Sequence, residues 1–378
     1  MNELDALRGV AREWADDFRA SALELDRSPA RIGELLDLPG VRYLSTYGVP
    51  REFGGAPLEI GAHRFDGTTA VERVVVFEEL ARGDTGMLLA APGPSMSGVL
   101  VDRLGDPAQR EWFFGRMMSA PTWTCFALTE PERGSDASLL ATSLREEGGA
   151  LVLRGAKRFV GNAARAQCAA VFARTGPGLG GVTAVLLDTD SAGYHATPLD
   201  TLGLRGAQLA AITLADVEVA PEQVLGRHLP RSRRGIWAAI GVFNRLRPAV
   251  AALGLGIAAA AHRYVLDNRP AAQGNDRDRI ETLGWKIDAT RALVLQAAAA
   301  VDATGEGYLA SAAKARACAL AEEVTLAACE LLAPAARAAH PLLDKLIRDA
   351  RGVEFMEGTR NIQQLNLFQG LRSGRAVG

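Results

Sequence analysis

The first third of the chain carries hydrophobic residues at helical spacing. Apolar positions in 4–14 recur every three or four residues, with charged residues between them, which places them on one face of a helix. A second amphipathic helix is predicted over 71–82. Asp106 followed by Pro107 marks another helix start, with an N-cap residue and then a proline at the first helical position. Residues 1–118 are therefore predicted to be helical.

The pattern changes to short apolar runs over 119–226, separated by Gly, Pro and Asp. Runs of this kind are typical of strands in a small sheet. The glycine-rich stretch 175–181 is interpreted as a mobile hairpin connection. No Lys-Ser/Thr pair follows it, so a phosphate-binding loop is not favoured. The predicted strands are 150–154, 169–174, 182–188 and 211–219.

From 227 to the C-terminus the chain is helical again and rich in alanine, the best helix former. The residue count favours a bundle of four main helices. Residues 254–259 match a Gly-x-Gly-x-x-Ala dinucleotide fingerprint, but no strand precedes them, so we set that interpretation aside. The predicted helices are 248–266, 276–301, 309–333 and 341–350.

Composition excludes several classes of protein. Hydrophobic residues make up 48% of the 378 residues and charged residues 23%, as in an ordinary globular protein. A net charge of −2 gives no general attraction to nucleic acid or to anionic lipid. The four cysteines lack paired spacing, so we expect free thiols and no metal site. We find neither a signal peptide nor an uncharged apolar run of membrane-spanning length, and we expect a cytoplasmic protein that binds no membrane.

Three short motifs carry the strongest information. The first is Thr129-Glu-Pro131 with Gly134-Ser-Asp136, and the second is Gly-x-Lys-x-Phe-Val-x-Asn at 155–162. The third, Met-Glu-Gly-Thr at 356–359, lies near the C-terminus. Together they resemble the signatures of the acyl-CoA dehydrogenase family, and the resemblance extends over nearly the whole chain.

The resemblance implies a mainly α fold with a central β-domain, arranged around FAD. Its three domains are expected at 1–118, an N-terminal α-helical domain, at 119–226, a small antiparallel β-barrel domain, and at 227–378, a C-terminal four-helix bundle. It also implies a set of cofactor-binding residues. These are Phe126, Leu128, Thr129, Gly134 and Ser135 in the first segment, Phe159, Val160 and Gly161 in the second, and Arg269 and Thr359 later in the chain.

Dehydrogenation of an acyl thioester needs a base for the Cα proton, and a carboxylate can be that base if burial raises its pKa. Glu357 stands just before Gly358 and Thr359, and Thr359 can cap a last helix. From spacing alone, a solvated glutamate beside a helix start is the favoured interpretation of Glu357. Glu357 matches the family's catalytic glutamate, which favours the catalytic role. Glu354 is the nearest competing carboxylate.

Four residues are expected to contact the substrate by the same resemblance. Asn244 and Arg247 match a polar contact and an arginine near the base, although a solvated helix face is an equal alternative for both. Ser135 and Gly358 complete this set.

The chain departs from the family in two late motifs. Arg269 is followed by Pro-Ala-Ala-Gln-Gly-Asn-Asp-Arg, which lacks the family's Phe-Gly and its Gln. A Gln-x-x-Gly-Gly-x-Gly turn is also missing; the region 331–340 has no such sequence. The usual contacts to the ADP half of FAD from a neighbouring subunit are therefore in doubt.

Such departures resemble family branches that oxidise acyl groups tethered to an acyl carrier protein, including those that supply polyketide and nonribosomal peptide assembly lines. Arginines at 227, 231, 233 and 234 can meet an acidic carrier protein or a phosphopantetheine phosphate, or can be a solvated basic loop. The expected function is FAD-dependent oxidation of an acyl thioester on a carrier protein, by a homodimer or homotetramer that binds no nucleic acid.

Three alternatives stay open. The first is an ordinary acyl-CoA dehydrogenase that uses free CoA thioesters. The second is a flavin oxidase or monooxygenase on the same fold, with O₂ as oxidant. The third is a paralogue that has lost FAD and acts as a binding protein.

Overall fold

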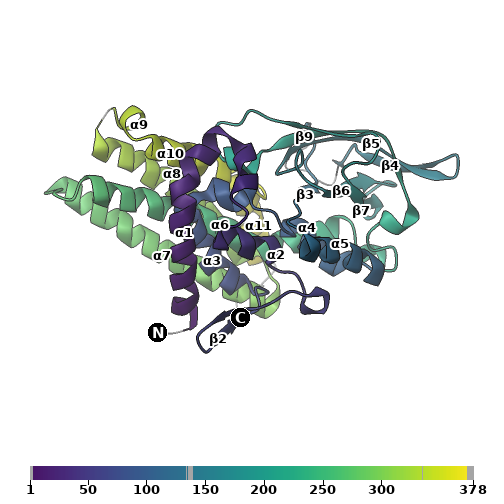
Figure 1. The fold of residues 1–378 in the computed structure, drawn as a ribbon, viewed down its shortest axis with the longest axis horizontal. Helices are drawn as coiled ribbons and strands as arrows, with labels where there is room; N and C mark the ends of the chain where they lie inside the picture. Colours follow the sequence, from purple (N-terminus) through teal and green to yellow (C-terminus); the bar gives the residue numbers. More distant parts are fainter. Residues whose placement is uncertain (1–2, 133, 135–138, 334, 373–378) are drawn as a thin grey trace.

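The computed structural model describes residues 3–132, 134, 139–333 and 335–372. The described chain forms a helical block, a sheet and a second helical block, and the sheet lies at one end of an elongated molecule (Figure 1). This order of elements confirms the predicted fold class.

The N-terminal block is mainly helical as predicted, but residues 58–60 and 63–65 form two short antiparallel strands that the sequence analysis did not predict. Asp106 caps α5 in a capping box with Gln109, and Pro107 is the first helical residue. The helix predicted at 71–82 runs further, to Ala90, and has non-helical backbone angles at Asp84. The elements are α1 (Glu3–Arg27), η1 (Pro29–Glu34), α2 (Pro39–Thr46), η2 (Arg51–Phe53), β1 (Leu58–Ile60), β2 (His63–Phe65), α3 (Ala70–Ala90), α4 (Ser95–Leu104) and α5 (Pro107–Ser119).

The middle of the chain forms a seven-stranded sheet in the order β3-β6-β4-β5-β9-β8, with β7 paired to β6. Most pairs are antiparallel, but β3 and β4 pair with β6 in parallel, which differs from the purely antiparallel expectation. A parallel pair needs a long connection, and the β4–β5 hairpin supplies it. The strands are β3 (Thr124–Ala127), β4 (Ser143–Glu147), β5 (Ala150–Val160), β6 (Cys168–Arg174), β7 (Val182–Asp188), β8 (Tyr194–Pro198) and β9 (Ala210–Val219).

The described C-terminal block contains the four predicted main helices, the predicted last helix after Thr359 and one further short helix. Three are long: α6 (Ile236–Asn268), α7 (Asn275–Thr304) and α8 (Tyr308–Leu332). The others are α9 (Ala336–Ala339), α10 (Pro341–Val353) and α11 (Arg360–Arg372). By length and composition, the helix ending at Asn268 is apolar enough to cross a membrane, but 72% of its most apolar window is buried inside the fold. It is the core helix of the bundle.

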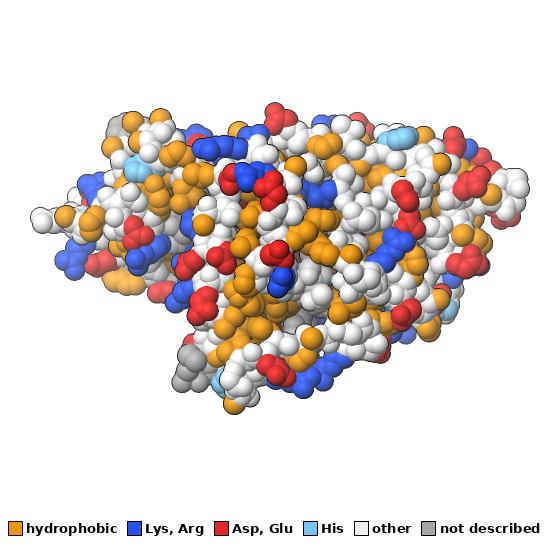
Figure 2. Space-filling model, in the orientation of Figure 1, with side chains coloured by type: hydrophobic (Ala, Val, Ile, Leu, Met, Phe, Trp, Pro, Cys, Tyr) orange, Lys and Arg blue, Asp and Glu red, His pale blue; other side chains and the backbone are white. Residues whose placement is uncertain are grey.

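The two helical blocks share one hydrophobic core. Buried residues of α1, α3, α6, α7, α8 and α10 form a single cluster. Both faces of β6 are buried, and its residues alternate between a cluster with α4, α5 and α6 and a second cluster within the sheet. A strand that is buried on both faces is a continuous apolar run, as β6 is. Figure 2 shows charged side chains of both signs over both ends of one face, with hydrophobic side chains gathered toward its middle.

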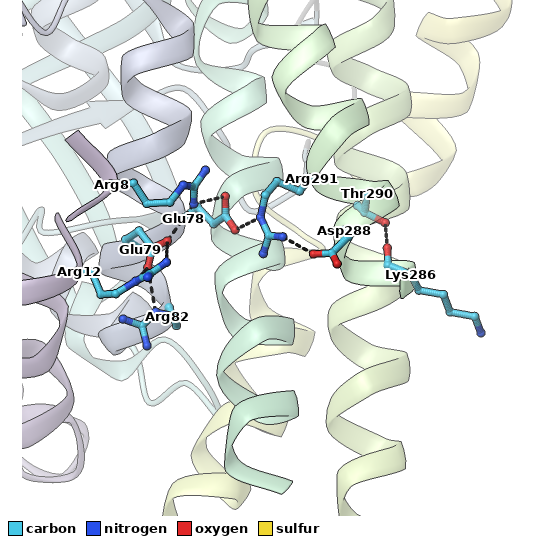
Figure 3. A network of polar contacts seen from close by, with 9 residues as sticks. All are labelled: Arg8, Arg12, Glu78, Glu79, Arg82, Lys286, Asp288, Thr290 and Arg291. Atoms are coloured by element: carbon cyan, nitrogen blue, oxygen red, sulfur yellow. Dashed lines mark hydrogen bonds and ion pairs between the residues drawn. The ribbon is translucent and has the colours of Figure 1, made fainter. Parts of the chain in front are cut away.

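Ion pairs also join α1, α3 and α7 (Figure 3). The buried carboxylate of Glu78 accepts hydrogen bonds from Arg8 at 3.1 Å and from Arg291 at 2.6 Å. Its neighbour Glu79 accepts from Arg8 and Arg12 of α1 and from Arg82. Adjacent glutamates inside an apolar helix are accommodated because each has several guanidinium partners.

Candidate active site

The two predicted flavin segments lie side by side. The N–H of Arg158 donates to the carbonyl of Thr129 at 2.9 Å, which joins the end of β5 to the segment after β3. Phe159 has a φ of +60° and lies where the pairing of β5 with β9 shifts register. Its side chain is 56% exposed. A non-glycine residue in this conformation is strained, and here the strain presents an aromatic ring to the outside of the sheet.

A buried ion pair below these segments keeps them together. The Lys157 ammonium donates to Glu130 at 2.9 Å and to the carbonyl of Leu128 at 3.1 Å. The Glu130 carboxylate also accepts the backbone N–H of Ala141 at 2.6 Å and of Thr142 at 2.9 Å. Glu130 is therefore an organising residue of the first segment. The sequence analysis assigned no role to this pair, although both residues are part of its motifs.

The remaining predicted cofactor residues differ in their surroundings. Phe126 is half-buried and packs against Phe172 and against Phe243 of α6, with ring centroids 5.0 and 5.9 Å apart. A Cβ on Gly161 would find its nearest atoms at 3.8 Å, so the structure leaves space for a side chain at this position. Leu128 and Val160 are buried. Gly134 is exposed, and Ser135 lies outside the described residues.

Glu357 lies between α10 and α11 on a tightly held backbone. Its φ is +50° and that of Gly358 is +96°, so two successive residues are left-handed. The Gln363 amide donates to the carbonyls of Glu357 and Gly358, both at 2.9 Å. Lys314 of α8 donates to the carbonyl of Glu354 at 2.8 Å and to that of Gly358. These contacts fix the direction in which the Glu357 side chain points.

The Glu357 carboxylate is desolvated. Although the residue as a whole is only half-buried, its Oε2 is buried and has no hydrogen-bond partner among the described residues. Burial raises its pKa to about 7, against the opposing influence of the positive charges of Arg247, Lys314 and Arg73. A carboxylate with this pKa can accept or release a proton near neutral pH.

Arg247 lies inside the protein, not on a solvated face. It is 5% exposed, and its Nη1 donates to the Asn244 side chain at 3.0 Å, while its Nε is buried without a partner. Burial lowers its pKa, and the nearby Glu357 raises it. The predicted substrate pair Asn244 and Arg247 is thus near Glu357.

Three other predicted or competing residues have structural partners. Glu354 is buried, and its Oε1 accepts the N–H of Arg360 at 2.7 Å, which caps α11. The Thr359 carbonyl accepts the N–H of Gln363 at 3.0 Å. Arg269 pairs with Asp276 and donates to the carbonyl of Leu331, so its guanidinium is already engaged at the turn between α6 and α7.

The structure adds three residues that the sequence analysis missed: Arg73, Lys314 and Gln363. All are buried. In the sequence, Arg73 and Lys314 each lie among apolar residues at helical spacing. A cation on the apolar face of a predicted helix was therefore the feature that could have identified them as buried. Gln363 lies on a helix that is otherwise poorly buried, and nothing in the sequence distinguished it.

The arrangement fits a planar cofactor that forms hydrogen bonds. It offers the exposed ring of Phe159 on a strained bulge, a buried Asn162 Oδ1 without a partner among the described residues, and the buried Glu357 Oε2, also without a partner there.

Comparison with known proteins agrees with this interpretation. Residues 125–217 match the acyl-CoA dehydrogenase middle domain, and residues 233–371 match the acyl-CoA dehydrogenase C-terminal domain. The chain belongs to the acyl-CoA dehydrogenase family.

Proteins similar to this acyl-CoA dehydrogenase family member match it over nearly its full length. A 3-(aryl)acrylate reductase from Clostridium sporogenes is 28% identical, with 97% of this chain and 98% of the relative covered. Butyryl-CoA dehydrogenase from Megasphaera elsdenii is 25% identical with a TM-score of 0.81, covering 97% and 98% of the two chains. The prolyl acyl carrier protein oxidase AnaB is 18% identical with a TM-score of 0.80, covering 98% and 99%.

Membership makes this chain an FAD-dependent oxidoreductase. The two adjacent segments contain the residues predicted to bind the flavin ring, and the buried Glu357 carboxylate is the candidate for proton chemistry. Among the residues that the structure describes, no group of three or more His, Cys, Asp or Glu could hold a metal ion.

Proposed function

We propose that this protein dehydrogenates an acyl thioester between Cα and Cβ, with Glu357 as the base. The observation that supports this most directly is the Glu357 carboxylate, which is buried, has no partner at Oε2 and has a pKa near 7. FAD, when bound, accepts the hydride from Cβ. The carboxylate of Glu357 takes the proton from Cα.

The surrounding residues hold and tune this base. Lys314 and Gln363 fix the backbone at 357–358 through its carbonyl oxygens. Arg247 and Lys314 keep the pKa of Glu357 from rising further, because their positive charges favour the carboxylate. In this proposal Asn244 and Arg247 also face the thioester end of the substrate.

The decisive experiment is an anaerobic single-turnover reaction of the Glu357→Gln holoenzyme with an acyl thioester. The substitution keeps the shape and removes the basicity. We expect bound FAD to be retained while its bleaching by substrate slows at least ~100-fold, the usual contribution of a positioned base. A nearly normal rate would remove Glu357 from this role.

Glu354→Gln is the matched control. Glu354 is three residues away and its Oε1 accepts the N–H of Arg360, which an amide oxygen can still do. We therefore expect Glu354→Gln to bleach at close to the normal rate.

We also propose that the acyl group is tethered to an acyl carrier protein, as in the supply of precursors for polyketide or nonribosomal peptide assembly. A hollow of about 440 Å³ lies beside the glycine-rich link 175–181 and is lined by Arg231 and Arg234. Two arginines at a hollow suit a phosphopantetheine phosphate and an acidic carrier surface. The fold shared with AnaB, a carrier-protein oxidase, is consistent with such a substrate.

Competition kinetics test this choice. A carrier-bound acyl group should react faster at equal concentration than the same acyl group on CoA. Charge reversal at Arg231, Arg233 and Arg234 should remove the advantage, most strongly at low salt, because exposed charges act mainly by steering. Equal kinetics with both substrates would favour free CoA thioesters. Rapid reoxidation of the reduced protein by air would favour an oxidase.

We further propose a cytoplasmic homo-oligomer. Within the described part of the C-terminal helix α11, Gln363 is its only buried residue, while Leu365, Phe368 and Leu371 are about half exposed or more. Exposed apolar side chains on one helix mark an interaction surface. Light scattering after size-exclusion chromatography would give the mass, and a monomer would contradict the proposal.

A further inference from the structure

Arg73 of α3 is a buried cation whose hydrogen bonds are incomplete. It is 5% exposed. One guanidinium nitrogen, Nη2, donates to the carbonyl of Gly67 at a long 3.5 Å. The other, Nη1, is buried without a partner among the described residues. No ion pair of Arg73 with a carboxylate is found in that part of the chain, and a buried guanidinium without one is costly.

The guanidinium lies over the ring of Tyr47, 5.4 Å from its centroid. The Tyr47 hydroxyl is also buried without a partner among the described residues. Burial raises the pKa of Tyr47 to about 12, so the phenol stays protonated and can donate. Two neighbouring side chains thus offer donors, Arg73 Nη1 and Tyr47 Oη, that nothing in the described chain accepts.

The pair belongs to the surroundings of Glu357. The positive charge of Arg73 is one of the three that lower the pKa of Glu357. The loop before α3 also touches the helix that carries Arg247, because Arg245 donates to the carbonyl of Thr68 at 2.8 Å. Arg73 therefore faces the same region as the candidate base without pairing with it.

No carboxylate of the described residues forms an ion pair with Arg73, although the adjacent Glu72 has a buried Oε2 without a hydrogen-bond partner there. Asp302 accepts the backbone N–H of Ala70 at 2.7 Å and of Val71 at 3.0 Å, at the start of α3. Burial raises the pKa of Glu72, against hydrogen bonds from the backbone of the loop before α3. Burial lowers the pKa of Arg245, the other cation nearby, and the positive charge of Arg73 lowers it further. In the described chain the guanidinium of Arg73 therefore has no ion-pair partner, and the charge of Glu72 acts on it without a direct contact.

We propose that Arg73 and Tyr47 form a subsite for a carboxylate on the acyl group, so that the preferred substrate is an acyl thioester with a second, negatively charged end. A carboxylate has two acceptor oxygens, which match one guanidinium and one phenol donor. It would also supply the missing counter-charge. This inference rests on the proposed function and narrows it to a class of dicarboxylic monothioester.

The test compares matched substrates on the wild-type holoenzyme. Succinyl, glutaryl and adipyl thioesters are paired with butyryl, pentanoyl and hexanoyl thioesters of equal chain length. Binding is measured by calorimetry, and bleaching of bound FAD by anaerobic stopped flow. We expect at least one charged member to bind at least ~10-fold more tightly than its neutral partner, the usual scale of a charge-assisted hydrogen bond.

Variants assign the preference to the subsite. Arg73→Met and Tyr47→Phe should each reduce the preference for the charged member. Arg42→Met, which removes an exposed guanidinium of α2, should leave it unchanged. If Arg73→Met does not fold, the comparison of substrates on the wild type and on Tyr47→Phe still tests the subsite.

The outcomes separate this inference from the proposed function. Bleaching by neutral thioesters with no preference for any charged partner overturns the subsite and leaves the dehydrogenase intact. Tighter binding of a charged member without bleaching by any thioester supports the subsite and overturns the proposed reaction. A preference that survives Arg73→Met and Tyr47→Phe also overturns the subsite.

Discussion

At the scale of single residues, the candidate base is held in a state that costs the fold free energy. Glu357 has positive φ, which is unfavourable for a side chain other than glycine, and its carboxylate is desolvated. Functional groups are often kept in such states by the structure around them. Here the contacts of Lys314 and Gln363 with the backbone at 357–358 provide that restraint.

The raised pKa of Glu357 predicts a pH-dependent stability. Its ordinary value of 4.5 becomes about 7 in the fold, so the folded state holds a proton that the unfolded state has released. Stability from this residue is complete below about pH 4.5 and is lost as pH rises to about 7. A shift of this size corresponds to about 3 kcal/mol. Glu357→Gln should therefore gain about 3 kcal/mol over wild type at pH 8.

Denaturant unfolding of wild type and Glu357→Gln at pH 4.5 and pH 8 checks this prediction. The gain of the variant should be larger at pH 8 by about the stated amount. A difference between the two proteins that is independent of pH would mean that the carboxylate is solvated in the fold.

Sequence reasoning recognised Glu357 because a motif marked it, and it did not recognise Arg73 or Lys314. From the local sequence alone, a cation among apolar residues at helical spacing is interpreted as a surface residue. Its burial depends on contacts made by distant segments, such as the Lys314 bonds to carbonyls 40 and 44 residues away. The periodicity of apolar residues along the sequence gives no information about such contacts. The roles expected for the cofactor- and substrate-binding residues stay predictions.

At the scale of elements, the strands that sequence reasoning found are those with buried apolar runs. β6 and β7 were predicted nearly at their observed bounds because nearly all of their residues are buried. β9, which has both buried and exposed residues, was also predicted nearly at its observed bounds. β4 was missed because its sequence, Ser-Leu-Arg-Glu-Glu, is mostly exposed. The parallel pairing of β3 with β6 could not be predicted, since register and direction depend on the three-dimensional path of the chain.

The Lys157–Glu130 pair gives a prediction for the joint between β5 and the segment after β3. Lys157→Met leaves a buried carboxylate that keeps two backbone N–H donors but loses its cation. Removal of one partner of a buried pair typically costs about 3 kcal/mol or more. We expect a loss of this order in the free energy of unfolding, together with weaker retention of FAD during gel filtration.

Lys286→Met is the control for this prediction. Lys286 pairs with Glu323, and both side chains are more than a third exposed, so its loss should cost less than about 1 kcal/mol. If both variants lose the same small amount, Lys157 does not hold the two segments together.

At the scale of the whole molecule, one buried ion cluster joins all three parts of the chain. Lys345 of α10 pairs with Asp84, at the break in α3, and with Asp349 at 2.6 Å. Asp349 also accepts the N–H of Leu204 at 2.6 Å, in the connection between β8 and β9. All three charged side chains are at most 2% exposed. The helical blocks and the sheet block therefore meet at a single cation.

Lys345→Met should destabilise the protein strongly at neutral pH and much less in acid. Without the ammonium, Asp84 and Asp349 are two neighbouring buried carboxylates, which costs about 3–5 kcal/mol at pH 7.5. Burial already raises the pKa of Asp84, and the charge of Lys345 opposes that rise, so the folded variant without this charge takes up a proton at Asp84 as pH falls. The loss relative to wild type should therefore shrink between pH 7.5 and pH 5. The double variant that also carries Asp84→Asn should recover part of the stability at pH 7.5, because one of the two unpaired buried carboxylates has been removed. Thermal unfolding of the three proteins at both pH values measures this. A loss that stays the same at pH 5, with no recovery in the double variant, would mean that Lys345 stabilises the fold only through the packing of its side chain.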